Sequence, residues 1–362
     1  MRTRVAIAYN EPHPSRYDTA GEKEAVLGVL HAVAAVHQAL LELGYSVTRV
    51  PLAPPLEQTG RKLRSLDADL VFNLFEGFCG YPETEALVPE ALSEMGIACT
   101  GCPGTVLRLA LDKAKVKVIL KAAGIATPDF QLLNPQTLHM FRLSYPCIVK
   151  PVGEDASHGL TEASVIGDFV SLEKQVTAIS ESYGGSALVE KFIDGREFNT
   201  TVLGNSQDTV LPISEIAYSL PSGTPRILTF AAKWEPASQY YQGTKVVCPA
   251  KINAEEQECV SGTALAAFRL LGCRGYARVD MRMDKEGRLN VIEINPNPDI
   301  SPDAGAARQA ETADMTYTRF IDRIVQLALE KEYRDNQYSS YVRKRQTSLD
   351  ENTAEYTGVQ AV

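Results

Sequence analysis

Residues 276–296 read Tyr276-Ala-Arg-Val-Asp-Met-Arg-Met-Asp-Lys-Glu-Gly-Arg-Leu-Asn-Val-Ile-Glu-Ile-Asn-Pro296. This stretch predicts two β-strands joined by a turn over 284–287, where Gly287 supplies the permissive turn backbone. A four-residue connection would pair position 283 with 288 and place position 278 opposite 293. The stretch therefore predicts a β-hairpin with a defined register.

Four polar side chains lie on one face of this predicted hairpin. Because side chains alternate faces along a strand, Arg278 and Asp280 share one face, and so do Glu293 and Asn295 on the next strand. Carboxylate and amide oxygens are the ligands that Mg²⁺ prefers. The alternative is a solvated hairpin that happens to carry charge. Glu293 stands in an otherwise apolar run, where a carboxylate needs a cation or strong hydrogen bonds, and this favours a metal site.

Composition sets the broad class of protein. The chain has 362 residues, of which 44% are hydrophobic and 22% charged, as in a globular protein of two or three domains. A formal net charge of -9 disfavours a nucleic-acid partner. Cys99 and Cys102 have the spacing of a metal or redox pair, but no second pair follows, so we expect small core residues. The chain enters a strand directly after Met1, and no window is long enough to span a membrane, so we expect a cytoplasmic protein.

The first hundred residues alternate strand and helix. Short apolar runs predict strands, and longer periodic segments predict helices. This alternation predicts a parallel sheet covered by helices, which we assign to an N-terminal domain over 1–102. The predicted strands span 5–9, 45–50, 68–75 and 97–100, and the predicted helices span 22–43 and 83–95.

Three further units follow along the chain. A central subdomain is predicted over 103–194, with a helix at 107–123 and apolar strands at 146–151 and 187–193. A C-terminal subdomain over 195–330 contains the hairpin and ends in a helix at 317–329. Residues 331–362 are polar and lack periodicity, so we expect a flexible tail with little part in the chemistry.

Several polar residues outside the hairpin suggest a nucleotide site. Lys150 ends an apolar strand, which is unusual for an ammonium group unless a buried anion meets it. The loop 153–159 that follows contains small residues whose backbone N–H groups could wrap phosphate oxygens. Lys113 and Lys233 could equally be solvated side chains. The segment 190–193 could offer backbone groups to a purine, and Glu197 could bind ribose hydroxyls, but neither reading stands firmly on local chemistry alone.

The order of these residues along the chain resembles the ATP-grasp fold, and more narrowly the D-alanine–D-alanine ligase family. The resemblance covers roughly residues 70 to 330. Its most specific part is Gly272-Cys-Arg-Gly-Tyr-Ala-Arg-Val-Asp280 together with Glu293-Ile-Asn295. It implies an α/β protein with an N-terminal Rossmann-like parallel sheet and two α+β subdomains that clasp ATP.

The resemblance also implies residue roles. Lys113, Lys150 and Lys233 would contact ATP phosphates, and Ser157 would do so from the loop 153–159, our candidate for a lid. Adenine would be held by Glu190 and by the backbone near Lys191, Phe192 and Ile193, with Glu197 on the ribose. Two Mg²⁺ ions, for which Mn²⁺ could substitute, would be bound by Asp280, Glu293 and Asn295, and Arg278 would lie beside the transferred phosphoryl group. Arg278, Lys233 and Ser157 are accordingly the implied catalytic residues.

The implied reaction is activation of a carboxylate by ATP to an acyl phosphate, followed by attack of an amine and release of ADP and phosphate. The partners would be small carboxylate and amine substrates, and the family expectation is a homodimer. The protein would mainly position the reactants and neutralise charge.

The substrate half departs from the family pattern. The stretch Ala8-Tyr-Asn-Glu-Pro-His-Pro-Ser15 replaces a glycine-rich start with a glutamate, although Glu11 or Glu22 could still serve. Glu76 stands where the family has histidine, and Ala156 and Trp234 replace a serine and a tyrosine. The run Pro296-Asn-Pro-Asp-Ile-Ser-Pro-Asp303 replaces serine-proline-glycine. We therefore predict substrate contacts at Glu11, Glu76, Arg278 and Asn297, and a substrate pair other than two D-alanines.

Three alternatives stay open at this stage. The chain could be the cell-wall D-alanine–D-alanine ligase with rearranged contacts. It could add an amino acid to a specialised metabolite such as a mycosporine-type scaffold. It could also be a nucleotide-binding regulator without catalysis, although a mere binder would not need three metal ligands and Arg278.

Overall fold

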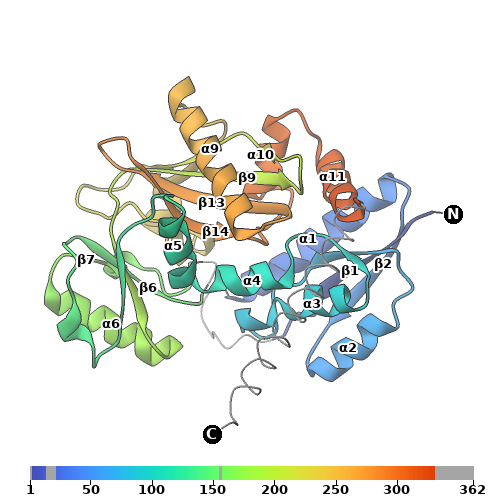
Figure 1. Ribbon diagram of the computed structural model, residues 1–362, viewed down its shortest axis with the longest axis horizontal. Helices are drawn as coiled ribbons and strands as arrows, with labels where there is room; N and C mark the ends of the chain where they lie inside the picture. The colour runs from blue at the N-terminus through green and yellow to red at the C-terminus, as the bar shows by residue number, and fades with distance from the viewer. Residues whose placement is uncertain (1, 14–21, 155–156, 331–362) are drawn as a thin grey trace, which may run out of the picture.

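The chain folds around three β-sheets, one for each of three neighbouring units (Figure 1). The structure is a computed structural model and describes residues 2–13, 22–154 and 157–330. The predicted tail 331–362 therefore lies outside the described residues. Figure 1 shows the N-terminal unit beside the unit that carries β13 and β14, with the unit that carries α6 at the other end.

The first unit confirms the predicted parallel sheet. Its four strands lie in the order β2-β1-β3-β4, and every neighbouring pair is parallel. The helices run between the strands, as the apolar periodicity of the sequence predicts. The elements are β1 (Arg4–Asn10), α1 (Glu22–Glu42), β2 (Ser46–Leu52), α2 (Leu56–Arg64), β3 (Leu70–Leu74), the 3-10 helix η1 (Pro82–Thr84), α3 (Leu87–Glu94) and β4 (Ala98–Cys99).

Two helices follow where the sequence predicted one. The predicted single helix 107–123 is wrong, because the chain breaks at Asp112 between α4 (Gly104–Leu111) and α5 (Lys113–Ala122). The Asp112 carboxylate caps α5 by accepting a hydrogen bond of 2.9 Å from the backbone N–H of Lys115. Both helices pack into the apolar core of the C-terminal sheet, through residues such as Val106 and Leu120.

The central unit is a four-stranded antiparallel sheet in the order β5-β8-β6-β7. Its one long helix, α6, packs on the sheet and closes a separate small apolar core. The elements are β5 (Phe130–Leu133), the 3-10 helix η2 (Leu138–Met140), β6 (Cys147–Pro151), the 3-10 helix η3 (Glu162–Ser164), β7 (Val165–Ile166), α6 (Phe169–Tyr183) and β8 (Ala187–Lys191).

The C-terminal unit is built on the largest sheet, in the order β12-β11-β9-β13-β14 with β10 beside β9. Helix α9 packs against this sheet (Figure 1). The elements are β9 (Arg196–Gly204), β10 (Thr209–Val210), β11 (Ser214–Tyr218), α7 (Phe230–Trp234), α8 (Gln239–Gly243), β12 (Thr244–Val247), α9 (Ala254–Leu271), β13 (Gly275–Met283), β14 (Leu289–Asn295), α10 (Gly305–Thr312) and α11 (Tyr317–Leu329).

The predicted hairpin exists, but its predicted register is wrong. Met283 pairs with Leu289 rather than with position 288, because the turn takes one more residue. A bulge at Ile292 then shifts the pairing again, so Asp280 lies opposite Glu293 and Arg278 opposite Asn295. The two shifts do not change which face each polar side chain occupies. The four polar residues still share one side of the sheet.

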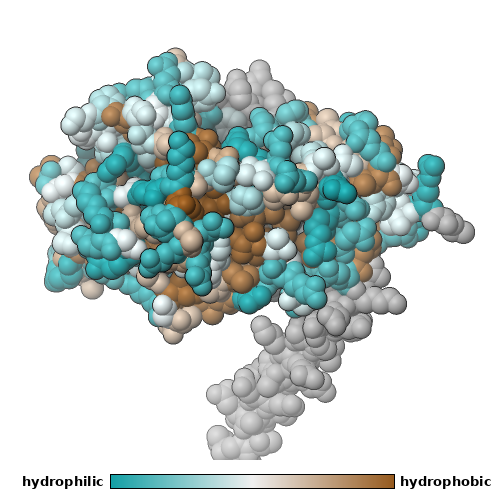
Figure 2. All heavy atoms as spheres, turned by 90° about the horizontal axis from the view of Figure 1, so that it is seen from above, coloured by the Kyte–Doolittle hydropathy of each residue, from teal (hydrophilic) through white to brown (hydrophobic). Residues whose placement is uncertain are grey.

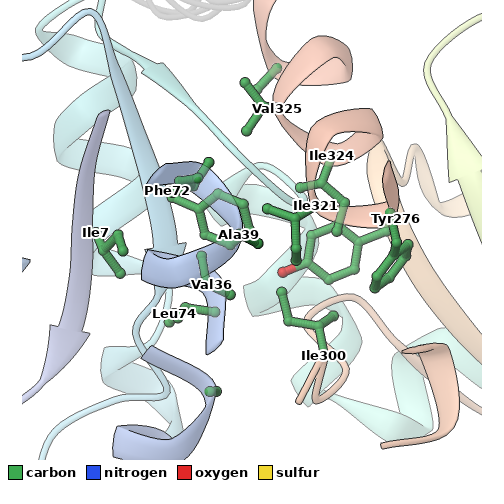
Figure 3. Packing of buried hydrophobic residues seen from close by; sticks show 14 of the residues in the cluster. Ile7, Val36, Ala39, Phe72, Leu74, Tyr276, Ile300, Ile321, Ile324 and Val325 are labelled. Atoms are coloured by element: carbon green, nitrogen blue, oxygen red, sulfur yellow. The ribbon is translucent and has the colours of Figure 1, made fainter. Parts of the chain in front are cut away.

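The N-terminal unit shares an apolar core with the C-terminal unit (Figure 3). Phe72 from β3 and Val36 from α1 belong to one buried cluster with Tyr276 from β13 and Ile321 and Ile324 from α11. Figure 3 shows these side chains facing one another across the boundary. The two units are therefore held together by hydrophobic burial as well as by chain connectivity.

The exterior is mostly polar on the face shown in Figure 2, with apolar residues gathered toward the middle. The free cysteines Cys99 and Cys102 are buried, which confirms their prediction as core residues. Within the described ranges, every helix falls short of the length and apolar character that crossing a bilayer requires.

Phe72→Ala should destabilise the protein by about 3 to 5 kcal/mol, since it removes a fully buried aromatic ring from the shared core. Urea unfolding at constant m value measures the change. Val118→Ala is the matched control, because Val118 is 58% exposed, and its free energy of unfolding should change by less than about 0.5 kcal/mol. Equal losses in both variants would contradict a core role for Phe72.

Candidate active site

One cavity of about 640 Å³ is lined by side chains from all three units. A volume of this size suits a nucleotide together with small substrates. All sixteen residues that the sequence singled out line it, although they span most of the chain. They are Glu11, Glu76, Lys113, Lys150, Ser157, Glu190, Lys191, Phe192, Ile193, Glu197, Lys233, Arg278, Asp280, Glu293, Asn295 and Asn297.

Arg278 and Asp280 form a two-pronged ion pair on β13. Arg278 Nε lies 2.7 Å from Asp280 Oδ1, and Arg278 Nη2 lies 2.8 Å from Asp280 Oδ2. Burial alone would lower the pKa of Arg278, but the neighbouring Asp280 carboxylate outweighs it and raises that pKa. Arg278 is therefore a fixed cation whose orientation is set by two parallel hydrogen bonds.

A second charged pair joins Glu293 on the facing strand β14 to Lys113 on α5. Lys113 Nζ lies 2.8 Å from Glu293 Oε1. Burial alone would raise the pKa of Glu293, but Lys113 and the nearby Lys150 and Arg278 outweigh it and lower that pKa to about 2. Glu293 is thus ionised at neutral pH, as a metal ligand must be. Two residues further on, Asn295 Oδ1 accepts a hydrogen bond of 2.9 Å from the backbone N–H of Asn297.

The oxygens of Asp280, Glu293 and Asn295 fit a magnesium site that a substrate completes. Among the described residues, no group of three or more His, Cys, Asp or Glu side chains could hold a metal ion by itself. Mg²⁺ in nucleotide enzymes is commonly bound by one or two carboxylates together with substrate phosphates. Two carboxylates and one amide on adjacent strands match that pattern.

A second cluster of charges lies at the end of β8. Glu190 Oε2 lies 2.9 Å from Lys150 Nζ, and the Glu190 side chain is only 1% exposed. The backbone N–H of Lys191 donates a hydrogen bond of 2.8 Å to the Asp129 carbonyl. The carbonyl of Ile193 accepts a hydrogen bond of 2.8 Å from Arg282 Nη1. The end of β8 and the residues directly after it are therefore held by Asp129 and Arg282.

Glu197 takes part in a buried network on β9. Its Oε2 accepts a hydrogen bond of 2.7 Å from the Tyr218 hydroxyl and also pairs with Arg282. Arg282 is 6% exposed, and its guanidinium lies 5.3 Å from the centre of the Phe192 ring. Arg282 was not predicted from the sequence. A cation between two methionines on a predicted strand was the available signal, of the same kind that drew attention to Glu293.

Lys233 projects from α7, whose first turn is capped by the Thr229 side chain. Burial and the nearby Arg278 lower the pKa of Lys233, while Glu293 and Asp280 oppose this shift. The described end of the loop 153–159 lies close by, since the His158 ring stacks on Phe230 with centroids 5.6 Å apart. Ser157 adopts a backbone φ of 65°, and residues 155–156 of the predicted lid lie outside the described residues.

The opposite end of the cavity is formed by the N-terminal unit and the segment after β14. Glu11 and Glu76 are exposed there. Asn297 Nδ2 donates to Glu85 and, at 3.3 Å, to the Phe75 carbonyl. The sequence analysis did not single out Glu85, because its partner lies 212 positions away in the chain.

Comparison with known proteins identifies the family. A family model described as "D-ala D-ala ligase C-terminus" matches residues 119–326. A relative from Sinorhizobium fredii (strain NBRC 101917 / NGR234), described as "Uncharacterized protein y4sG", is 35% identical over 260 residues, which cover 72% of this chain and 74% of the relative. The chain belongs to the D-alanine–D-alanine ligase family.

Two other proteins extend this picture of the family. A putative D-alanine–D-lactate ligase from Streptomyces coelicolor (strain ATCC BAA-471 / A3(2) / M145) is 32% identical over 269 residues, which cover 74% of each chain. The crystal structure of D-alanine–D-alanine ligase from Bacillus anthracis complexed with ATP superposes with a TM-score of 0.70. It covers 92% of this chain and 99% of that one at 21% identity, and this likeness shows the fold.

Membership of this family confirms the ATP-grasp fold and the class of reaction. The chain is an ATP-dependent ligase that acts on small molecules, in a family that uses ATP and a divalent metal. The regulator reading loses its support accordingly. The domain boundaries and the role of each site residue stay predictions.

Proposed function

We propose that this ligase joins a carboxylate to a small amino-bearing acceptor through an acyl phosphate, and that the pair is not two D-alanines. The observation that carries this proposal is the contrast between the two ends of the cavity. Every lysine and arginine that lines the cavity comes from residue 113 or later, at the end near β8 and β14, where carboxylates such as Asp280 and Glu293 also lie. Among the described residues, the lining of the N-terminal unit contains Glu11, Glu76 and Glu85 but no lysine or arginine. The first end suits phosphates, and the second suits a cationic amine.

The cationic end would bind the nucleotide. Lys113, Lys150 and Lys233 would neutralise the phosphates, and Ser157 would donate to them from the loop. Because the Lys191 N–H and the Ile193 carbonyl are already bonded to protein, the purine edge would use the Lys191 carbonyl and the Ile193 N–H. Phe192 would pack against the adenine base, and Glu190 would help to hold the adenine from the end of β8. Glu197 would bind the ribose hydroxyls.

The metal ligands fit two Mg²⁺ ions, or Mn²⁺ in their place, once phosphate oxygens complete the coordination. Bound there, the ions would neutralise phosphate charge during transfer. Asp280 and Glu293 would hold the ions from their present places beside Arg278 and Lys113. Arg278, fixed by Asp280, would stabilise the charge that develops on the transferred phosphoryl group. In the second step, the Arg278 guanidinium would face the oxygen of the acyl carbon that the amine attacks.

The chemistry follows from the poor electrophilicity of a carboxylate. Attack of the donor carboxylate oxygen on the γ-phosphorus forms an acyl phosphate and releases ADP. The acceptor amine then attacks the acyl carbon and loses a proton, the C–O bond to phosphate breaks, and an amide forms. The acyl phosphate must be kept from water, which is the role we assign to the loop 153–159 as a lid.

Glu76 is the residue that we propose to select the acceptor. A carboxylate at this place repels a substrate carboxylate and attracts an ammonium group. Glu11 and Asn297 would add contacts at the same end. A hydroxy-acid acceptor, in line with the name of the Streptomyces coelicolor relative, is the second candidate. Dimerisation and a cytoplasmic location remain predictions of the sequence.

Purified protein should release ADP in a Mg²⁺-dependent manner with one particular donor and acceptor from a panel of D- and L-amino acids, amines and hydroxy acids. Mass analysis should show a product whose mass equals the sum of the two substrate masses minus the mass of one water. Efficient turnover of D-alanine alone, at ordinary cellular concentrations, would overturn the proposed substrate pair. A hydroxy-acid acceptor would establish ester formation instead of amide formation.

A further inference from the structure

Lys117 is a buried lysine that does not line the cavity. It lies on α5 one turn after Lys113, and its side chain is only 2% exposed. A lysine is almost never buried to this extent unless it is paired. Lys113 at the same helix face reaches Glu293 in the active site. Lys117 contacts instead a carboxylate that itself lines the cavity.

The partner of Lys117 is Glu190. Lys117 Nζ lies 3.0 Å from Glu190 Oε1, while the other carboxylate oxygen, Oε2, lies 2.9 Å from Lys150 Nζ. Lys117 Nζ also donates a hydrogen bond of 2.9 Å to Thr127 Oγ1, which itself donates one of 2.8 Å to the Val291 carbonyl. A single carboxylate thus lies between two ammonium groups, and only Lys150 reaches the cavity.

The contacts of Lys117 join two structural units. Its neighbours on α5, Val116 and Leu120, pack in the core of the C-terminal sheet. Glu190 belongs to β8 of the central sheet. The ammonium group is therefore fixed from the C-terminal unit, and it fixes Glu190 in turn. Glu190 is thus held by Lys117 of α5 as well as by Lys150 of β6.

The formal charges of Lys117, Lys150 and Glu190 indicate how Lys117 affects Lys150. Two lysines and one glutamate carry a net charge of +1. Without Lys117, Glu190 and Lys150 would form a neutral buried pair, and the Lys150 ammonium would be drawn fully to the carboxylate. With Lys117 present, one negative charge is shared between two cations. Lys150 then keeps positive charge to offer to an anion in the cavity.

We infer that Lys117 is a positioning residue that preserves the positive charge of Lys150 for nucleotide phosphates by sharing Glu190. Lys117 itself touches neither substrate nor metal. The inference rests on the proposed contact between Lys150 and the phosphates. It predicts that Lys117 matters for the phosphates of a nucleotide far more than for its nucleoside.

Lys117→Met should weaken ATP binding roughly tenfold or more, which matches the loss of one charge-assisted hydrogen bond from Lys150 to a phosphate. Adenosine binding should change less than about twofold. Titration calorimetry measures ATP directly and adenosine by competition. Lys115→Met is the matched control, since Lys115 lies on the same helix but is exposed. It should leave both affinities unchanged. An unchanged ratio of the two dissociation constants in Lys117→Met would overturn the inference.

The double variant Lys117→Met/Glu190→Gln separates charge sharing from mere packing. Its net charge is again +1, carried by Lys150 alone. We expect its ratio of adenosine to ATP dissociation constants to return to within about threefold of the wild type. A ratio as low as in Lys117→Met would overturn the inference. Should Lys117→Met fail to give a cooperative thermal transition, the same ratio in the double variant and in Lys117→Arg, which keeps the charge, decides the matter.

The ATP titration of the wild type distinguishes an error in the proposed nucleotide site from an error in the role of Lys117. If the wild type fails to bind ATP, the assignment of the nucleotide site is wrong and the inference falls with it. If the wild type binds ATP and the ratio stays constant across the variants, only the role of Lys117 is wrong.

Discussion

Glu293→Gln or Asp280→Asn should lower the turnover number of the ligase by about 100-fold or more at saturating ATP and Mg²⁺. Each change replaces a carboxylate oxygen on adjacent strands of the same hairpin face by a neutral amide of equal size. Glu293, whose pKa is lowered to about 2, carries a full negative charge at neutral pH. Its loss removes a metal ligand and also removes the carboxylate that lies 2.8 Å from Lys113 Nζ.

Mg²⁺-dependent ADP release under single-turnover conditions measures this effect, because it reports the chemical step rather than product release. Glu286→Gln is the matched control on the same hairpin, since Glu286 is 66% exposed in the turn. It should turn over at the wild-type rate. A loss of less than threefold in Glu293→Gln and Asp280→Asn would remove both residues from the metal site.

The sequence predicted the hairpin face correctly despite a wrong register. Side chains on a strand alternate with period two, so Arg278 and Asp280 stay together wherever the partner strand begins. Register depends on turn length and bulges, and an extra turn residue and the bulge at Ile292 altered it. The face on which a side chain lies can therefore be predicted correctly even when the register of the strand pair is wrong. The residue that lies opposite it cannot.

Residues that act from behind the cavity were harder to predict. Lys117 lies four positions after Lys113, and that spacing places both on one helix face. The pattern of lysines at 113 and 117 was therefore a usable signal for a shared function. The break at Asp112 gave a weaker signal, because a single aspartate in a periodic apolar stretch can either cap a new helix or lie on the exposed face of a continuous one. Partners distant in sequence, such as Glu85 for Asn297, give no local pattern.

The site also shows why the substrate half resisted prediction. Part of the proposed nucleotide half lies toward strand ends, as at Lys150 and Glu190, where a polar residue interrupts an apolar run and is easily noticed. The proposed acceptor end is built from the loops around Glu11, Glu76 and Asn297, where polar residues are expected anyway. A charged residue in a loop indicates a function only when the structure shows that it lines a cavity with the other site residues.

Arg278→Lys should lower the turnover number by roughly 100- to 1000-fold, the cost of losing a preorganised donor to the developing charge. Lysine keeps the positive charge, but it is a point charge on a flexible stem and cannot reproduce the planar fork. The fork holds Asp280 through two parallel contacts of 2.7 and 2.8 Å. Lysine would satisfy one of them and leave the position of the metal ligand less well defined.

The same substitution should change the ATP dissociation constant by less than about threefold, because the net charge of the cavity is preserved. The expected signature is thus a loss in turnover without a matching loss in ATP binding, which marks an interaction made mainly in the transition state. Arg288→Lys is the matched control, since Arg288 is 69% exposed at the hairpin turn. If Arg278→Lys weakened ATP binding as strongly as turnover, Arg278 would serve the ground state of the nucleotide rather than phosphoryl transfer.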